Sequence, residues 1–242
     1  MTILVVGASG ATGRLLVEQL LNEGETVKAI VRLKQSLPTH LRRHPKLTVT
    51  EANLLEMSDA ELEDQVQGCH AIASCLGHNL TFKGMFGHPR RLVTDSAKRL
   101  CQAVKNTNSS LPVKFVLMNT SGNQNKQADE KITLGHRIVV GLLRCLVPPH
   151  ADNEDAAAYL QTHYAASDHI EWVAVRPDGL TNEDSLTPYE IFPSPQRDPI
   201  FDAGKTSRIN VAGFMAQLIA DDQLWAKWRG QMPVIYNANA VD

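Results

Sequence analysis

Residues 3–21 read ILVVGASGATGRLLVEQLL, and this stretch predicts the fold of the whole chain. Residues 3–6 form a short run of apolar, mostly β-branched side chains, the pattern of a strand buried on both faces. Three glycines follow at intervals of three, and residues 14–21 have the apolar spacing of a helix. Strand, glycine turn and helix in this order form a phosphate cradle, because the backbone can approach a diphosphate and the helix N-terminus presents free N–H groups. The glycines are Gly7, Gly10 and Gly13.

The rest of the chain repeats the alternation of buried strands with helices. Strands that alternate with helices favour an α/β fold of the Rossmann type, a doubly wound parallel sheet in a single domain over residues 1–242. A proline-rich segment at about 178–208 is expected to form part of the substrate pocket. Further strands are predicted at 26–31, 47–50, 71–75, 113–118, 170–175 and 232–236, and further helices at 59–66, 89–105, 151–166 and 208–220.

The composition excludes several classes of protein. The chain has 242 residues, 43% of them apolar, and a formal charge of −2, so we expect no surface for nucleic acid. It has no run of about 18 apolar residues, which argues against a membrane-spanning helix. The first strand begins at once and the four cysteines form no CxxC pair, so we expect a cytoplasmic protein with reduced thiols. His40 and His44 lie four residues apart without a third ligand nearby, so no metal site is expected.

The end of the second strand indicates which nicotinamide cofactor such a fold would hold. In dinucleotide folds this position meets the adenosine ribose, where an acidic residue suits NAD and a basic residue suits the extra phosphate of NADP. Arg32 occupies the position here, and Lys34 follows closely. Arginine pairs well with phosphate because its planar guanidinium donates two parallel hydrogen bonds. The pattern favours NADP(H) over NAD(H), with a solvated surface arginine as the alternative.

Two stretches of the sequence resemble one protein family. Residues 5–13, VVGASGATG, and their GxxGxxG spacing are very similar to the opening of atypical short-chain dehydrogenase/reductases. Residues 171–184, EWVAVRPDGLTNED, resemble the WT(I/V)(V/L)RPxxLT stretch of the same family, which includes NmrA-like, flavin-reductase-like and biliverdin-reductase-B-like proteins. The resemblance covers nearly the whole chain and implies an NAD(P)-binding protein, often a reductase.

The resemblance, together with the rule that ligands bind at the carboxyl ends of parallel strands, selects the candidate site residues. Ser121 best matches the catalytic or substrate-orienting serine that the family places after the fifth strand, and Thr120 is the alternative. Asn53 and Leu54 stand where the family places an aspartate and an apolar residue against the adenine. Asn210 replaces a family aspartate at a helix start and is expected to be an N-cap. The expected cofactor contacts are Gly7, Ser9, Gly10, Ala11, Thr12, Gly13, Arg32, Asn53, Leu54, Leu76, Gly77, Asn119, Thr120, Arg176 and Pro177.

The chain departs from the family in lacking a tyrosine–lysine pair. Typical short-chain reductases protonate their product with a tyrosine that a lysine four residues later activates, and no YxxxK occurs here. Measured back from Arg176, the tyrosine position falls near His150 and the lysine position near Glu154. His150 is a candidate acid because histidine changes charge near neutral pH, and a plain helix-start histidine is the alternative. Tyr159 is the second candidate, or else a packing residue.

Three functions follow, in order of preference. The first is NADPH-dependent reduction of a conjugated small molecule, such as a flavin or a quinone-like compound, which takes hydride into an extended π-system without a tyrosine acid. The second is a non-catalytic NADP sensor that binds a regulatory protein partner, as in the NmrA-like branch. The third is a carbonyl reductase or epimerase-like enzyme that uses Ser121 with His150 or Tyr159.

Three segments that connect the predicted strands and helices have distinctive compositions. Residues 78–88 form a loop whose two phenylalanines and methionine, at positions 82, 85 and 86, either line an apolar pocket or anchor the loop. Residues 123–130 are hydrophilic and expected to be mobile. Residues 132–147 are apolar and helical up to Pro148-Pro149, and they are expected to pack under the substrate region or against a partner, in a homodimer or a regulatory complex.

Overall fold

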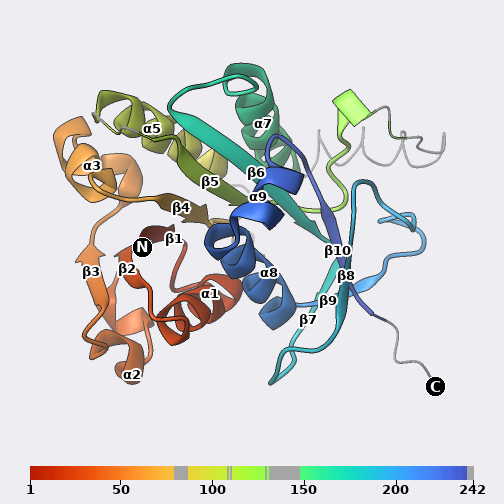
Figure 1. The fold of residues 1–242 in the computed structure, drawn as a ribbon, viewed down its shortest axis with the longest axis horizontal. Coiled ribbons are helices and arrows are strands. Elements are labelled where there is room, and N and C mark those ends of the chain that lie inside the picture. Colours follow the sequence, from red (N-terminus) through yellow and green to blue (C-terminus); the bar gives the residue numbers. More distant parts are fainter. Residues whose placement is uncertain (79–86, 108, 110, 129, 131–147, 239–242) are drawn as a thin grey trace.

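A single twisted sheet of eight strands organises the computed structural model, which describes residues 1–78, 87–107, 109, 111–128, 130 and 148–238 (Figure 1). The strand order is β3-β2-β1-β4-β5-β6-β10-β8. Seven strands run parallel, and β8 pairs antiparallel with β10. The strands are β1 (Thr2–Val6), β2 (Thr26–Val31), β3 (Leu47–Glu51), β4 (Ala71–Ser74), β5 (Val113–Met118), β6 (Ile170–Pro177), β8 (Tyr189–Phe192) and β10 (Val234–Asn237).

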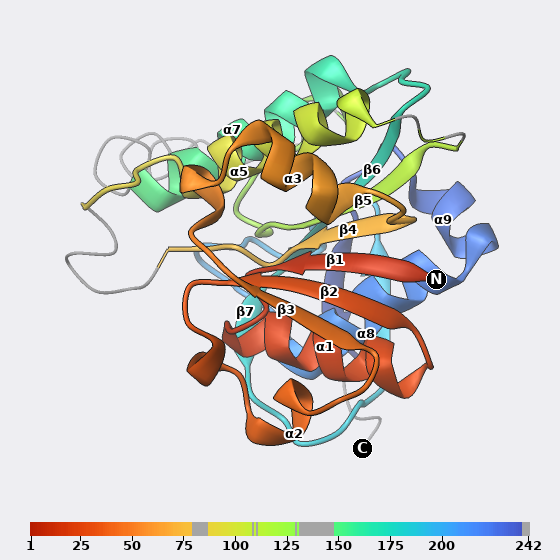
Figure 2. The ribbon, with the colours of Figure 1, turned by 90° about the vertical axis from the view of Figure 1, so that its left-hand side faces the viewer.

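Helices cover both faces of this sheet, as Figure 2 shows, and the prediction of a doubly wound α/β fold is confirmed. One layer holds α3 (Asp59–Val66), α5 (Leu92–Asn106) and α7 (Pro148–His163), which contact one another in sequence order. The other layer holds α1 (Ala11–Asn22) and α8 (Arg208–Ala220), with α9 (Asp222–Trp228) against α8. The described residues also form the short helices α2 (Thr39–Arg42), η1 (Lys34–Ser36), η2 (Leu54–Glu56) and η3 (Lys126–Ala128).

Strand β1 shows why the opening stretch of sequence is apolar throughout. Its side chains alternate between two cores, since successive residues of a strand point to opposite faces. Ile3 and Val5 belong to the core beneath α1 and α8, whereas Leu4 and Val6 belong to the core beneath α3, α5 and α7. All four are at most 1% exposed, as expected of a central parallel strand.

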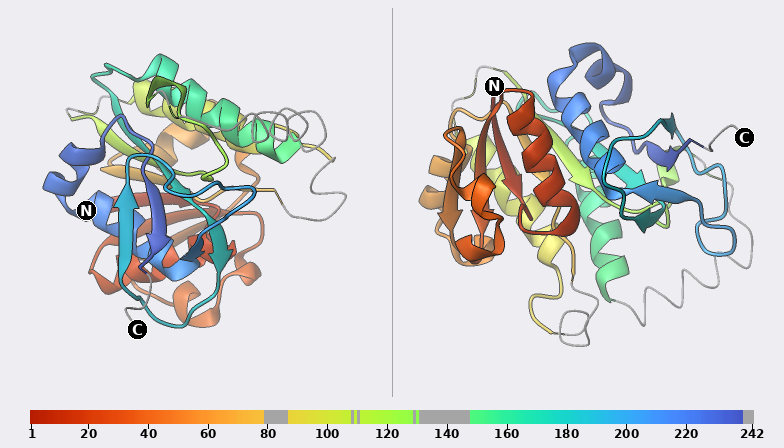
Figure 3. Two further views of the ribbon diagram at one scale, coloured as in Figure 1. Left: turned by 90° about the vertical axis from the view of Figure 1, so that its right-hand side faces the viewer. Right: turned by 90° about the horizontal axis from the view of Figure 1, so that it is seen from below.

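The segment after β6 forms a small separate structure at the carboxyl end of the sheet. Strands β7 (Gly179–Thr181) and β9 (Lys205–Ser207) pair parallel with each other, beside β8 and β10 (Figure 3). Helix α8 begins directly after β9, and the expected cap at Asn210 is wrong, because Ser207 accepts the helical N–H. Asn210 is fully buried, and its side-chain amide joins Thr187 to Asn237.

The structure gives more detail on two predicted segments. The hydrophilic segment predicted at 123–130 contains two buried side chains, Asn123 and Asn125, and the short helix η3, and its mobility stays a prediction. Helix α7 begins at the proline pair, three residues earlier than predicted, since proline is compatible with the first turn of a helix. The predicted helix at 132–147 and the apolar side chains at 82, 85 and 86 lie outside the described residues.

In the parts of the chain that the structure describes, no helix combines the length and apolar character needed to cross a membrane.

Candidate cofactor and active site

The backbone of the glycine turn between β1 and α1 packs closely against the residue after β4 and against its own carbonyl groups. Gly7 has a φ of +76°, a conformation that side chains rarely adopt, and a Cβ there would lie 2.5 Å from the Cys75 carbonyl carbon. A Cβ on Gly13 would lie 2.2 Å from the Gly7 carbonyl oxygen. Gly10 donates its N–H to the same oxygen at 3.0 Å. The turn therefore requires the absence of side chains at positions 7 and 13, and it places the end of β1 against the residues that follow β4.

The exposed side of this turn has the properties of an anion site. Ser9, Gly10 and Ala11 are exposed, while Thr12 is buried. Gly10 is the N-cap of α1, so no side chain satisfies the first N–H groups of the helix, and its first turn carries no acidic residue. Free N–H groups and the positive end of the helix dipole favour a phosphate at such a position.

The neighbouring strand ends frame this turn. Leu76 and Gly77 follow β4, and the Leu76 nitrogen would lie 2.7 Å from a Cβ on Gly7. Burial raises the pKa of the Cys75 thiol to about 12, so this cysteine stays protonated at neutral pH. Cys75 is therefore a packing residue of the turn.

Arg32 lies directly after β2 and is exposed. Within the described residues its guanidinium has no hydrogen-bond or ion-pair partner. Glu51, at the end of β3, is the one acidic residue opposite the end of β2, and its carboxylate accepts the backbone N–H of Lys34 at 2.6 Å. Arg32 is thus available to an anionic ligand at this edge.

The sequence predicted adenine contacts at both Asn53 and Leu54, but the two residues differ in their exposure to solvent. Asn53 is exposed at the start of η2, where its side chain accepts a hydrogen bond from Leu55 and donates one to Glu56. Leu54 is only 6% exposed and belongs to the core with α3 and α5. Its side chain therefore stabilises the fold rather than facing solvent at the sheet edge.

The turn after β5 is anchored by two polar side chains that the sequence nominated for the site. Asn119 is buried, donates to the Asn153 carbonyl of α7 and accepts the Thr120 N–H at 2.8 Å. Ser121 is 4% exposed and donates its hydroxyl to Asp178 at 3.0 Å. Its backbone N–H donates to the buried Pro177 carbonyl. The Ser121 hydroxyl is therefore engaged within the protein.

Asp178 was not predicted, and it gathers donors from three segments. Besides Ser121, it accepts the N–H of Gly179 at 3.0 Å and of Gly204 at 2.8 Å. Burial raises the pKa of Asp178, and these hydrogen bonds reduce the rise without cancelling it. Asp178 thereby fixes the β7–β9 segment to the end of β5.

Arg176 was predicted as a cofactor contact, and its side chain is instead a buried connector. The guanidinium is fully buried and pairs with both carboxylate oxygens of Glu130, at 2.6 and 3.0 Å. It also donates to the carbonyls of Asn123, Pro193 and Met232. All of its donor nitrogens are engaged, so a ligand contact through the guanidinium is excluded in this arrangement. Arg176 thereby joins Asn123 and Glu130 to the end of β6.

The start of α7 brings His150 to the turn after β5. A Cβ placed on Gly122 would lie 3.6 Å from His150 Cε1 and 3.8 Å from Thr120 Oγ1. One turn along the helix, Glu154 Oε1 faces His150 Nε2 at 3.4 Å, and both side chains are 13% exposed. His150 therefore borders Gly122 in the turn after β5, and Glu154 lies next to His150 on α7.

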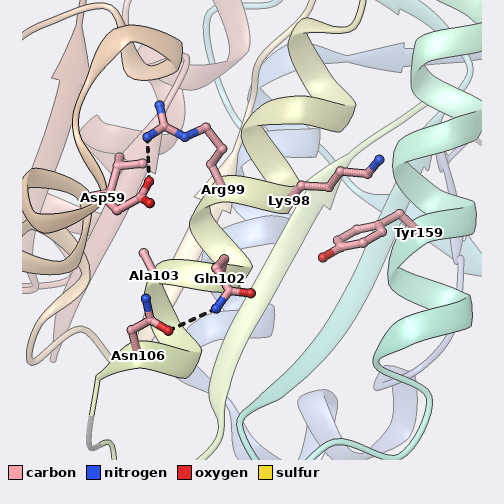
Figure 4. Close-up of a pocket in the computed structure, with 8 residues that line it drawn as sticks. Asp59, Lys98, Arg99, Gln102, Ala103, Asn106 and Tyr159 are labelled. Atoms are coloured by element: carbon pink, nitrogen blue, oxygen red, sulfur yellow. Dashed lines mark hydrogen bonds and ion pairs between the residues drawn. The ribbon is translucent and has the colours of Figure 1, made fainter.

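Tyr159 does not belong to this group. It lies in a groove of about 290 Å³ between α3, α5 and α7, together with Lys98 and Arg99 (Figure 4). Lys98 Nζ stands 5.5 Å above its ring, and its hydroxyl contacts that of Tyr164 at 3.3 Å. Tyr159 is three turns into α7, far along the helix from the carboxyl edge of the sheet, and these contacts agree with the alternative prediction of a packing residue.

A buried pair that the sequence did not indicate joins His78, shortly after β4, to α7. His78 Nε2 lies 2.8 Å from Asp152 Oδ2, and both side chains are almost fully buried. The same carboxylate accepts the N–H groups of Val93 and Thr94, the first-turn donors of α5. Burial raises the pKa of Asp152, but the hydrogen bonds from His78, Thr94 and Val93 outweigh it and lower the pKa overall. Asp152 thus acts as the cap of a helix on a different part of the chain.

Among the described residues, no three histidine, cysteine or acidic side chains lie close enough together to hold a metal ion.

The glycine turn, the exposed helix start and the strand ends are matched by a family model. A model of NAD(P)H-binding proteins matches residues 7–222. The chain belongs to this NAD(P)H-binding family. The match begins at the first glycine of the turn and includes the carboxyl ends of β2, β4, β5 and β6, so the resemblance to atypical short-chain reductases is confirmed at the level of the family.

One curated relative matches a short part of the chain. The uncharacterized protein At2g34460, chloroplastic, from Arabidopsis thaliana is 40% identical over 57 residues, which are 24% of this chain and 20% of that protein. The chain thus matches about a fifth of the length of this relative.

Solved structures with the same fold cover nearly the whole chain. The oxidoreductase ylbE from Lactococcus lactis is 20% identical with a TM-score of 0.68, over 98% of this chain and 91% of that one. A short-chain dehydrogenase/reductase from Veillonella parvula in complex with NADP is 16% identical with a TM-score of 0.67, over 98% and 95%. ChuY, an anaerobilin reductase from Escherichia coli O157:H7, is 15% identical with a TM-score of 0.70, over the whole of both chains. At these identities the likeness shows the fold.

Proposed function

We propose that this member of the NAD(P)H-binding family is an NADPH-dependent oxidoreductase that reduces a conjugated small molecule without a tyrosine–lysine pair. The proposal rests on which residues lie at the carboxyl ends of the strands. The glycine turn lies at one end of this edge together with Arg32, whose guanidinium has no partner among the described residues, and Tyr159, the tyrosine nearest in sequence to the expected position, lies outside the edge. The names of the solved relatives, an oxidoreductase and an anaerobilin reductase, agree with this proposal.

The residues at the edge fit a nicotinamide dinucleotide. Gly7 and Gly13 leave the space that a Cβ would fill, and the first N–H groups of α1 would hold the diphosphate. Arg32 would pair with the adenosine phosphate of NADPH, and Leu76 and Gly77 would border the ribose side of the site. When bound, the reduced nicotinamide supplies a hydride. The protein's own task is then to orient the acceptor and to exclude competing reactions.

A conjugated acceptor suits the side chains that are present. Hydride addition to an isolated carbonyl builds negative charge on one oxygen, which needs a strong donor at that atom. A flavin or a quinone-like compound spreads the charge over an extended π-system, so a positioned tyrosine is not required. Ser121 donates its hydroxyl to Asp178, so the serine that the family resemblance nominates does not offer this proton to a simple carbonyl.

The test is consumption of NADPH, followed by the absorbance of the reduced nicotinamide, against a panel of flavins, quinones and simple carbonyls. Turnover with flavins or quinones supports the proposal, and turnover with carbonyls alone favours a carbonyl reductase. Tight NADPH binding without turnover on any acceptor would overturn the proposal and favour an NADP sensor with a regulatory partner.

The choice of cofactor is tested separately by Arg32→Ala. Loss of a charge-assisted phosphate contact, worth about 1.5–3 kcal/mol, should weaken NADPH binding by about 10- to 100-fold and leave NADH nearly unchanged. Fluorescence titration measures both affinities. Arg229→Ala is the matched control, since Arg229 is an exposed arginine paired with Glu171 near the start of β6, at the opposite edge of the sheet. Equal losses for NADPH and NADH would contradict the assignment of Arg32.

A further inference from the structure

The turn after β5 offers one hydroxyl that the protein does not itself use as a donor. Ser121 donates to Asp178, and the amide of Asn119 donates to α7. Thr120, between them, is only half-buried, and its Oγ1 accepts the Gly122 N–H at 3.3 Å. In the described part of the chain no group accepts the Thr120 hydroxyl proton. Thr120, rather than Ser121, therefore has a hydrogen bond to offer to a bound acceptor.

A histidine–glutamate pair borders the same turn. His150 and Glu154 are one helical turn apart, so their side chains lie on one face of α7. His150 Nε2 is buried without a hydrogen bond and lies at ion-pair distance from Glu154 Oε1. The His150 Cε1 edge faces Gly122, on the side where Thr120 Oγ1 also lies. The second ring nitrogen, Nδ1, is bonded to Cε1 and therefore lies at the same edge of the ring.

Glu154 can hold the orientation of the imidazole ring. Its Oε1 lies 3.4 Å from His150 Nε2, and both side chains are only 13% exposed.

We propose that Thr120 and the His150–Glu154 pair form the acceptor end of the site, in place of the missing tyrosine–lysine pair. The inference rests on the proposed function and specifies where the proton comes from. Thr120 donates a hydrogen bond to an oxygen or nitrogen of the acceptor, His150 is the acid, and Glu154 is a positioning residue that acts through His150.

The step balances as a two-electron reduction. The acceptor gains a hydride from the reduced nicotinamide and carries the new electron pair on its oxygen or nitrogen. An N–H bond of the His150 imidazolium breaks, and an O–H or N–H bond forms on the acceptor. The neutral imidazole then takes a proton from water. The acceptor class that fits is a conjugated compound with a carbonyl or imine at the end of its π-system.

Kinetic tests use pairs of variants that separate chemistry from packing. His150→Gln should lower kcat by about 100-fold, the lower range for loss of a positioned acid, with the Kd for NADPH unchanged. Glu154→Gln should lower kcat by about tenfold, and Glu154→Asp should recover part of it. Thr120→Val should lower kcat, whereas Thr120→Ser should retain it. His163→Gln, the same substitution at the other end of α7, is the control and should leave kcat unchanged, and the Tm of each variant reports folding.

A binding measurement gives an answer that does not depend on turnover. In cofactor-free protein with isotope-labelled histidine, riboflavin should move the NMR signals of the His150 ring and leave those of His163 in place. Turnover by the wild-type protein with full kcat in His150→Gln would overturn this inference and leave the proposed function intact. If the wild-type protein consumes no NADPH, the proposed function fails, and an unmoved His150 signal would then overturn the acceptor site as well.

Discussion

Removing the Glu130 carboxylate should unfold the protein at a much lower temperature, because within the described residues this group is the only anionic partner of the buried Arg176 guanidinium. The Glu130 side chain is 4% exposed and the Arg176 side chain is 0% exposed. Glu130→Ala leaves a charged guanidinium buried with backbone carbonyls alone, and breaking such a pair costs about 3–5 kcal/mol. In a protein of this size each kcal/mol lowers Tm by about 2–4 °C, so we expect a fall of about 6–20 °C.

Thermal unfolding followed by circular dichroism measures this effect, and the chain holds a matched control. Arg197 and Asp202 form an exposed pair with an N–O distance of 2.6 Å, as short as the closest Arg176–Glu130 contact. Asp202→Ala should leave Tm close to that of the wild type, because exposed pairs contribute little. Glu130→Gln, which keeps the shape and one acceptor, should fall between the two. Similar small shifts for Glu130→Ala and Asp202→Ala would refute the reasoning that burial gives the pair its importance.

Two further substitutions test the glycine turn and the buried carboxylate beside it. Gly13→Ala places a Cβ 2.2 Å from the Gly7 carbonyl oxygen, so the turn must move, and we expect NADPH binding, measured by fluorescence titration, to weaken at least tenfold; wild-type affinity would show that the turn adapts without cost. Asp178 has a raised pKa, so its contribution to stability is full below the ordinary value for aspartate and is lost as pH rises through the raised pKa. Asp178→Asn should therefore lower Tm at acidic pH and make Tm fall less steeply as the pH rises above about 4. Tm measured from pH 4 to 7 checks this. If Tm fell as steeply in the variant as in the wild type, the titration of Asp178 would not be the cause of the fall.

The parts of the site that sequence could predict depend on neighbours along the chain. Gly13 is required because its Cβ would overlap the carbonyl of a residue only six positions earlier. The strand before the turn and the helix after it are equally local, and their periodicity identified them. Arg32 could be placed because a residue directly after β2 must lie at the carboxyl edge of a parallel sheet.

The parts that could not be predicted depend on pairs far apart in the chain. Glu130 is 46 residues before Arg176, and His78 is 74 residues before Asp152, so neither carboxylate differs in its local sequence from a surface residue. The cap of α8 illustrates the same limit at short range. Ser207 and Asn210 are both good N-cap residues three positions apart, and only the distant partners of Asn210 decide that Ser207 is the cap.

The cap that Asp152 provides for α5 has a consequence for hydrogen exchange. First-turn amides of a helix ordinarily exchange fast, because they have no partner within the helix. The amides of Val93 and Thr94 are instead held by a carboxylate on α7, at 2.8 and 2.9 Å. Their exchange therefore requires α7 to leave α5, even while α5 itself stays helical. These two amides are built-in reporters of the free energy that docks one helix on the other, readable in the unmodified protein.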